Sequence, residues 1–213
     1  MASQPPIPLA PELRTPRVRG PLRAQILRRS SELASIDGLE QVSIGCLAAA
    51  MGMSKSGLYA YFTSKEDLQL ATIECAWGVF EEHVLEPGDD SVEALLERWI
   101  SYYENEVFPG GCVFITAGME FANRDGPVHD ALATVIERQT AVLEQALRRE
   151  RAGDADPAQL AFELHALVTA ANHRFRMSRD PAAFERGRAA IGRLLGARQP
   201  LASRPRSSAH NAP

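Results

Sequence analysis

Apolar residues recur along this chain at intervals of three and four positions, and alternating apolar and polar runs are scarce. Because this spacing is typical of helices that bury one face, the pattern predicts an all-α protein. Proline, glycine and capping residues divide the chain into about nine helices. The expected helices cover 21–36, 43–51, 54–62, 64–85, 90–107, 113–123, 128–151, 157–178 and 180–195.

The start of each early helix carries a recognisable capping signal. Ser43, Ser54 and Ser64 are placed to act as N-caps, and Asp67 stands at the reciprocal capping-box position of the last of these helices. Gly52 supplies the left-handed residue of a tight turn between the second and third helices. Three short helices with a glycine turn before the third predict a helix-turn-helix unit.

A helical wheel of the third helix separates its residues into two faces. Lys55, Ser56 and Tyr59 share one arc, whereas Leu58 and Phe62 lie on the other and are expected in the core. The first arc offers an ammonium, a hydroxyl and a phenol near a helix N-terminus. Such a face can donate to base edges and phosphates in a major groove.

Two flanking residues complete the candidate surface. Tyr61 falls nearer the inner arc, so we expect it at the groove edge, reaching a phosphate. Lys65 lies in the first turn of the fourth helix, where its charge opposes the helix dipole unless an anion lies close. A phosphate would supply that anion. Taken singly, each of these residues is more often an ordinary surface residue, and it is their combination that favours DNA binding.

The charge distribution also indicates a polyanionic partner. The net charge is −4 over 213 residues, yet residues 1–65 hold eight Lys and Arg against four Asp and Glu, so the remainder carries −8. Segments 1–20 and 197–213 are rich in Pro, Arg and Ser and are predicted to be disordered. Arg14, Arg17 and Arg19 form either an arm that contacts DNA or a solvated tail.

The stretch VSIGCLAAAMGMSKSGLYAYFTSKEDLQLA, residues 42–71, resembles the TetR family of bacterial transcriptional repressors. The resemblance rests on a glycine turn followed by a spaced motif formed by Ser54, Lys55, Leu58, Tyr59, Phe62, Lys65 and Leu68. It implies a set of DNA-contacting positions at Ser43, Lys55, Ser56, Gly57, Tyr59, Tyr61 and Lys65, to which we add the cap Ser54. Cys46 departs from the family, which often has an acidic or polar residue there.

The resemblance also implies the domain organisation. Residues 21–66 would form the helix-turn-helix domain, and 67–196 a domain for ligand binding and dimerisation. The last two long helices, 157–178 and 180–195, would build a four-helix bundle with a second copy. Which of their faces form that interface and which face the core stays open at this point.

The central part of the chain holds most of the aromatic residues, of which the majority are expected in an ordinary core. A helical domain can nevertheless bind a small molecule in an apolar cavity with a few polar groups. The candidate lining residues are Trp99, Tyr103, Phe114, Thr116, Glu120, Phe121, His165 and Asn172. For Glu120, an exposed position on a short helix is at least as good an interpretation.

Other function classes lack sequence support. The three cysteines show no CxxC pairing, the five histidines have no metal-ligand spacing, and catalytic and nucleotide-binding motifs are missing. We therefore expect no enzyme activity, no cofactor and no metal. Without an apolar run long enough for a membrane span, or a secretory signal, the expected location is the cytoplasm.

These observations predict a ligand-responsive transcriptional regulator. It would bind a palindromic DNA operator as a homodimer, act as a repressor, and be released by an unidentified small-molecule inducer. An activator and a ligand-independent DNA-binding protein are the alternatives.

Overall fold

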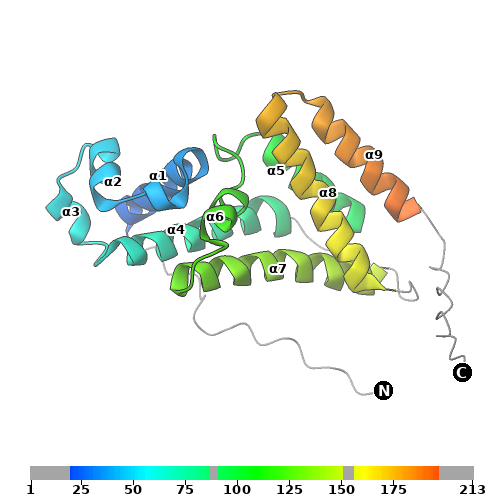
Figure 1. Cartoon of the computed structure of the whole chain (residues 1–213), viewed down its shortest axis with the longest axis horizontal. Helices are drawn as coiled ribbons and strands as arrows, with labels where there is room; N and C mark the ends of the chain where they lie inside the picture. The colour runs from blue at the N-terminus through cyan, green and yellow to red at the C-terminus, as the bar shows by residue number, and fades with distance from the viewer. Residues whose placement is uncertain (1–19, 87–90, 151–155, 197–213) are drawn as a thin grey trace, which may run out of the picture.

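The computed structural model describes residues 20–86, 91–150 and 156–196, and within them it is all-helical, as predicted (Figure 1). Nine α-helices and no strand occur in these ranges. The helices are α1 (Pro21–Asp37), α2 (Ile44–Met51), α3 (Lys55–Tyr59), α4 (Lys65–Phe80), α5 (Val92–Glu104), α6 (Val113–Phe121), α7 (Pro127–Glu150), α8 (Pro157–Ser178) and α9 (Ala182–Gly196). A 3-10 turn, η1 (Leu39–Gln41), follows α1, and a π-helical turn, η2 (Glu81–Leu85), follows α4.

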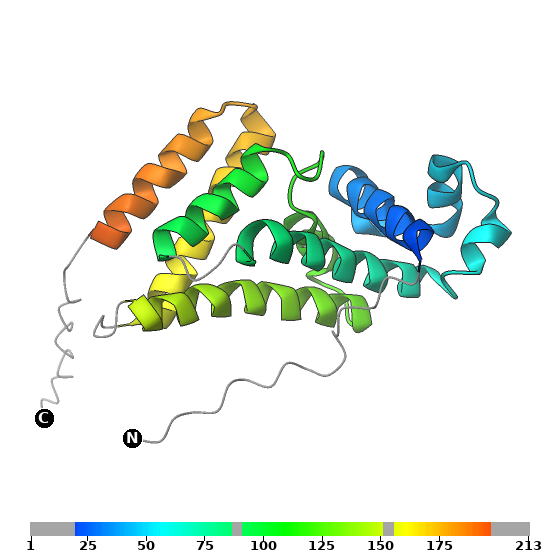
Figure 2. The same cartoon turned by 180° about the vertical axis from the view of Figure 1, so that it is seen from behind.

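The helices form two parts joined by α4. We call α1, η1, α2 and α3 the head, and α5 to α9 the body. The head lies at one end of the molecule and the α8–α9 pair near the other, with α4 running from the head alongside α7 (Figures 1 and 2). None of the helices in the described ranges is long and apolar enough to cross a membrane.

Hydrogen bonds confirm the predicted caps of α2, α3 and α4. The hydroxyls of Ser43, Ser54 and Ser64 each accept from the backbone N–H three residues later, at 3.2, 3.1 and 3.0 Å. Gly52 ends α2 with φ of 64°, in the left-handed region that the turn requires. Asp67 accepts from the backbone N–H of Thr63 at 2.8 Å, one residue before the expected capping-box partner.

Several details of the helices differ from the expectation. The fifth helix is capped by Ser91, which accepts from the N–H of Ala94, rather than by Asp90. Helix α3 ends at Tyr59, and α4 gives way to the π-helical turn after Phe80. Leu22, assigned to the buried face of the first helix, is 39% exposed because α1 begins at the edge of the head. The predicted arm, with Arg14, Arg17 and Arg19, and the predicted tail 197–213 lie outside the described residues.

The head is fixed to α4 by a partly polar contact. Ser30 of α1 lies 2.6 Å from the Thr72 hydroxyl, and both residues are fully buried. Gln69 donates to the Leu39 carbonyl at 3.1 Å. Satisfied polar groups of this kind specify one arrangement of two helices, since each would be costly to bury alone. The start of α4 is therefore held against the head.

Candidate nucleic-acid interface and cavities

The outer face of α3 is polar and exposed. Lys55, Ser56 and Tyr59 are exposed, with 57% of Tyr59 accessible, whereas Leu58 and Phe62 are fully buried. The wheel prediction for these five residues is confirmed. The helix therefore presents its ammonium, hydroxyl and phenol outward while its two apolar residues anchor it in the head core.

Lys55 also lies against α2, which the sequence reasoning missed. A Cβ atom built on Gly45 would stand 3.3 Å from Cε of Lys55 and 3.6 Å from its Nζ. The absence of a side chain at Gly45 therefore lets the lysine stem lie across the start of α2. One sequence signal could have predicted this contact. Gly45 is the second residue of a short helix, where a glycine weakens the helix and therefore suggests a close neighbour.

The serine hydroxyls of this surface are engaged in capping. Ser54 Oγ accepts from the N–H of Gly57 and lies 3.0 Å from Ser56 Oγ, and Ser43 caps α2. Each hydroxyl can still exchange one further hydrogen bond with a phosphate oxygen. Tyr61 is half-buried, with its ring centroid 6.5 Å from that of Phe62, so its contact with a phosphate at the groove edge stays a prediction.

The anion expected near Lys65 is a side chain of the protein itself. Lys65 Nζ donates to Glu40 Oε1 at 2.8 Å, and Arg124, just after α6, donates to Glu40 Oε2, also at 2.8 Å. The hydrogen bond from Lys65 is the main cause that lowers the pKa of Glu40 below its ordinary value. Glu40 thus links the candidate DNA-contacting lysine to the body.

Glu120 faces the head rather than a body cavity. Its carboxylate accepts from the backbone N–H of Glu40 at 3.2 Å. A Cβ on Gly38 would lie 1.7 Å from Glu120 Oε1, so the carboxylate occupies the space left by that glycine, whose φ is 91°. Glu120 therefore fastens α6 to η1, and both interpretations offered from the sequence missed this contact.

The other predicted ligand-contacting residues divide into two groups. Trp99, Tyr103, Phe114 and Phe121 are buried in an aromatic core, where Trp99 donates to the Tyr103 hydroxyl at 2.8 Å. His165 is half-buried with its ring 5.5 Å from Trp99, and burial lowers its pKa. Thr116 and Asn172 lie elsewhere, on the wall of a cavity.

That cavity, of about 380 Å³, lies between the head and the body. Its wall comes from the end of α1, the segment after α5, α6 and the last turns of α8. The lining residues are Ser35, Ile36, Gly110, Cys112, Ile115, Thr116, Asn172, His173, Arg176 and Arg179. It is large enough for a small organic molecule.

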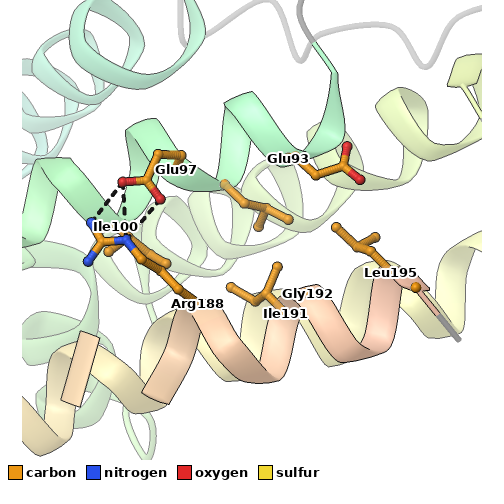
Figure 3. Close-up of a pocket in the computed structure, with 9 residues that line it drawn as sticks. Glu93, Glu97, Ile100, Arg188, Ile191, Gly192 and Leu195 are labelled. Atoms are coloured by element: carbon orange, nitrogen blue, oxygen red, sulfur yellow. Dashed lines mark hydrogen bonds and ion pairs between the residues drawn. The ribbon is translucent and has the colours of Figure 1, made fainter. Parts of the chain in front are cut away.

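A second hollow, of about 320 Å³, lies between α5 and α9 (Figure 3). Arg188 points across it and donates to both carboxylate oxygens of Glu97, at 2.7 and 2.9 Å, and to Glu104 at 2.6 Å. These bonds raise the pKa of Arg188 and lower that of Glu97. Because two carboxylates share the single guanidinium of Arg188, the described lining of this groove has no uncompensated positive charge for an anionic ligand.

The described residues contain no group of three or more His, Cys, Asp or Glu side chains that could hold a metal ion. Cys46, Cys75 and Cys112 are all free thiols. Burial raises the pKa of Cys75 and Cys112, which disfavours the reactive thiolate at both positions.

A helix-turn-helix that presents an exposed polar helix at one end of an all-helical chain defines a class, the DNA-binding regulators. Two family models match this chain: "Bacterial regulatory proteins, tetR family" over residues 26–72, and "Tetracyclin repressor-like, C-terminal domain" over residues 88–191. The chain belongs to the TetR family of transcriptional regulators, whose members bind DNA and are not enzymes. No curated protein matches the sequence significantly.

Solved structures share the fold at low identity. A TetR-family regulator from Chloroflexus aurantiacus is 21% identical, with a TM-score of 0.73, covering 81% of this chain and 93% of its own. One from Cytophaga hutchinsonii is 20% identical, with a TM-score of 0.69 and coverages of 81% and 92%. AibR, solved with isovaleryl coenzyme A and operator DNA, is 22% identical, with a TM-score of 0.62 and coverages of 80% and 95%.

Proposed function

We propose that this protein is a ligand-responsive repressor that binds a palindromic operator as a homodimer and is released by a small-molecule inducer. The observation that carries the proposal is the outward face of α3, where Lys55, Ser56 and Tyr59 are exposed above a buried apolar face. Such a face matches the donor and acceptor pattern of a major groove. Ser43, Ser54, Gly57, Tyr61 and Lys65 would contact the flanking backbone. Such a repressor would act in the cytoplasm.

Dimerisation is supported by the outer surface of α8. Phe162 and Met177 are 63% and 76% exposed, and they lie fifteen residues apart, about four helical turns, so they share one face. Ala166, Ala170 and His173, all exposed, lie between them on that face. Two exposed apolar side chains with small residues between them allow a second helix to approach closely. A symmetric pair of heads would then read two half-sites of a palindrome.

Small residues on α9 do not all serve that interface. A Cβ on Gly187 would lie 2.9 Å from Cβ of Ala171, so Gly187 allows α9 to approach α8 within the same chain. Gly192 has no atom within 4 Å of such a Cβ because it lines the hollow between α5 and α9 (Figure 3). The proposed interface therefore consists mainly of the outward α8 face, with α9 beside it.

Release by an inducer is supported by the connections between head and body. Glu120 and Arg124 hold η1 through Glu40, and α4 begins beside the same carboxylate with Lys65. A ligand that favours a different position of α6 or α4 would change the angle of the head. The structure of AibR with an acyl coenzyme A and operator DNA provides a precedent for both kinds of partner in a protein of this fold.

Selection of duplexes from a random library, followed by titration of the selected duplex, tests the proposal. We expect a palindromic sequence that binds two chains per duplex, with an affinity that falls steeply as salt rises. Equal affinity for selected and random duplexes at physiological salt would contradict it. A reporter gene placed behind the selected duplex separates repression from activation, because activation would increase expression.

A further inference from the structure

The cavity between the head and the body has the composition of a binding site. It is distinct from the aromatic core, where Trp99 and Phe114 are almost completely buried. Its wall includes residues of α1 in the head as well as residues of α6 and α8 in the body. Any molecule bound there would therefore contact both parts of the protein.

Asn172 lines the cavity and carries an unsatisfied polar atom. The residue is 3% exposed, and its Oδ1 has no hydrogen-bond partner in the described part of the chain. A buried acceptor left without a donor is destabilising, and native structures contain few of them. The oxygen is occluded in this structure, so a small rotation of the amide toward the cavity would bring it to a ligand hydroxyl or N–H group.

Arg176 stands one helical turn after Asn172 and brings positive charge to the same wall. Its guanidinium donates to Glu106 at 2.8 Å, and Arg179 donates to the same carboxylate oxygen at 3.5 Å. Two guanidinium groups thus share one carboxylate, which leaves excess positive charge. The residues that line the cavity in the described structure include no Asp or Glu to compensate it.

The remaining wall supplies apolar area and a further acceptor. Ile36, at the end of α1, is 54% exposed, and Ile115 of α6 lines the same space. A ligand with an apolar body would cover both side chains. Thr116 donates its hydroxyl to the Cys112 carbonyl at 3.3 Å, so its oxygen stays able to accept a hydrogen bond.

We propose that this cavity binds a small organic anion with an apolar body and a hydrogen-bond donor, such as a hydroxylated carboxylic acid, and that this molecule is the inducer. The carboxylate would bind Arg176 and Arg179, the donor would meet Asn172 Oδ1, and the body would lie against Ile36 and Ile115. The contacts of the lining residues support ligand binding in this cavity. The role of that ligand as the inducer rests on the proposed repressor function.

A ligand in this cavity would lie where the head contacts the body, and it could therefore change the position of the head. Beside the cavity, the N–H of Gly110 donates to Ser35 Oγ at 2.9 Å, and a Cβ on Gly110 would lie 1.8 Å from the Ser35 carbonyl oxygen. The end of α1 is therefore in close contact with the body at the cavity rim. A ligand that widens this space favours a conformation in which α1, and the α2–α3 pair with it, is tilted.

Calorimetric titration of the full chain, without DNA, tests the site. The probes are 4-hydroxybenzoate, 3-(4-hydroxyphenyl)propionate and 6-hydroxyhexanoate, each compared with its primary amide. We expect at least one acid to bind with one molecule per chain, and its amide to bind at least roughly tenfold more weakly, since a charge-assisted contact to Arg176 is lost. No binding of any acid at about 10 mM, or equal binding of acid and amide, would overturn the proposal.

Two variants locate the binding. Arg176→Gln and Asn172→Leu should each weaken it at least roughly tenfold, while Arg174→Gln, an exposed charge on the same helix outside the cavity lining, should not change it. Asn172→Leu should also raise the Tm of the ligand-free protein by about 2–4 °C, because it removes a buried unsatisfied acceptor. Unchanged binding in both variants, or a lower Tm for Asn172→Leu, would contradict the assignment.

Adding the bound acid to the complex with the selected duplex tests the inducer role separately. We expect the affinity for DNA to fall at least roughly tenfold, which corresponds to an ordinary allosteric coupling. Unchanged affinity for DNA would overturn the inducer role. If no duplex is selected at all, the repressor function fails, while the calorimetric result for the cavity is unaffected.

Discussion

Lys55 and Lys65 are the two lysines of the chain, and their surroundings differ. Lys55 is exposed on α3, and its stem lies along the α2 backbone at Gly45. Lys65 is half-buried and bonded to Glu40. A phosphate near Lys65 must therefore compete with a carboxylate, whereas Lys55 can bind a phosphate or a base edge without such competition.

The first prediction concerns the outward face of α3. Lys55→Ala and Tyr59→Ala should each lower the affinity for the selected duplex by about 1–3 kcal/mol, because each removes a contact to a base edge or a phosphate. Fluorescence anisotropy of labelled duplex measures the loss. Arg148→Ala, which removes one positive charge from the exposed end of α7, is the control and should change little. Wild-type affinity in both α3 variants would exclude this face as the recognition surface.

The second prediction concerns Glu74 on α4. Burial raises the pKa of Glu74 from 4.5 to about 7, against the positive charge of Arg23, which lowers it. Between pH 4.5 and about 7, the Glu74 carboxyl is therefore protonated in the folded state and ionised in the unfolded state. As a result, this carboxyl makes the protein less stable as the pH rises from about 4.5 to 7, and the loss is complete above pH 7.

Glu74→Gln should accordingly raise the free energy of unfolding at pH 8 and have little effect near pH 4.5. We expect a gain of about 1 kcal/mol, less than the full pKa shift implies, because the side chain is partly exposed and screened by solvent. Urea denaturation at both pH values measures it. The exposed Glu137→Gln serves as the control, and a gain that does not depend on pH would count against the explanation.

At the scale of elements, the contact between the head and the body depends on glycines and carboxylates in complementary positions. Gly38 leaves space for the Glu120 carboxylate, and Gly110 allows the segment after α5 to touch the backbone of α1. Arg28 strengthens the same region by donating to the Val107 carbonyl at 2.9 Å and lying 5.0 Å above the Phe108 ring. Part of the positive charge of the head therefore serves the fold.

The third prediction tests this contact. Gly110→Ala should destabilise the protein by about 3 kcal/mol, since the added Cβ would overlap the backbone of Ser35, which cannot move aside as a flexible side chain could. Gly78→Ala is the matched control. It lies within α4 with no atom within 4 Å of the added Cβ, so it should stabilise by about 0.5–1 kcal/mol. Chemical denaturation measures the free energy of unfolding of both variants. Equal stabilities would contradict the close contact between Gly110 and the backbone of Ser35.

For the whole molecule, the two ends have different surfaces. The head exposes the polar face of α3, and the outer face of α8 exposes Phe162 and Met177. Such an arrangement suits a dimer held together at one end with two DNA-contacting heads at the other (Figure 1). The cavity beside α1 lies between these ends, where a ligand could influence the spacing of the heads.

The fourth prediction concerns the dimer. Phe162→Asp should raise the dissociation constant of the dimer at least roughly hundredfold, because it places a charge in an apolar contact. A loss of this size is typical of interface hot spots. Sedimentation equilibrium measures it. Met119→Asp, at an apolar residue on α6 that is 78% exposed, is the control and should leave the dimer intact. A monomeric wild-type chain at micromolar concentration would contradict the dimer itself.

Local signals in the sequence determined the helix-turn-helix and most of its exposed surface. Serine caps and the Gly52 turn act through hydrogen bonds within a few residues, and helical periodicity separates Tyr59 from Leu58 without reference to the rest of the chain. These features were therefore predictable. The length of α3 was not, because helix ends depend on competition among weak interactions that are similar in energy.

Contacts between distant residues were decided by the tertiary structure alone. Glu40 meets Arg124 across 84 positions, and Glu120 reaches the Glu40 backbone across 80. The sequence predicts that Glu120, Thr116 and Asn172 line one ligand pocket. Packing of α6 on η1 turned Glu120 toward the head, while α6 and α8 brought Thr116 and Asn172 to the cavity. The physical reason is that periodicity specifies which face of a helix is buried, but the neighbour that covers this face depends on how all the helices pack together.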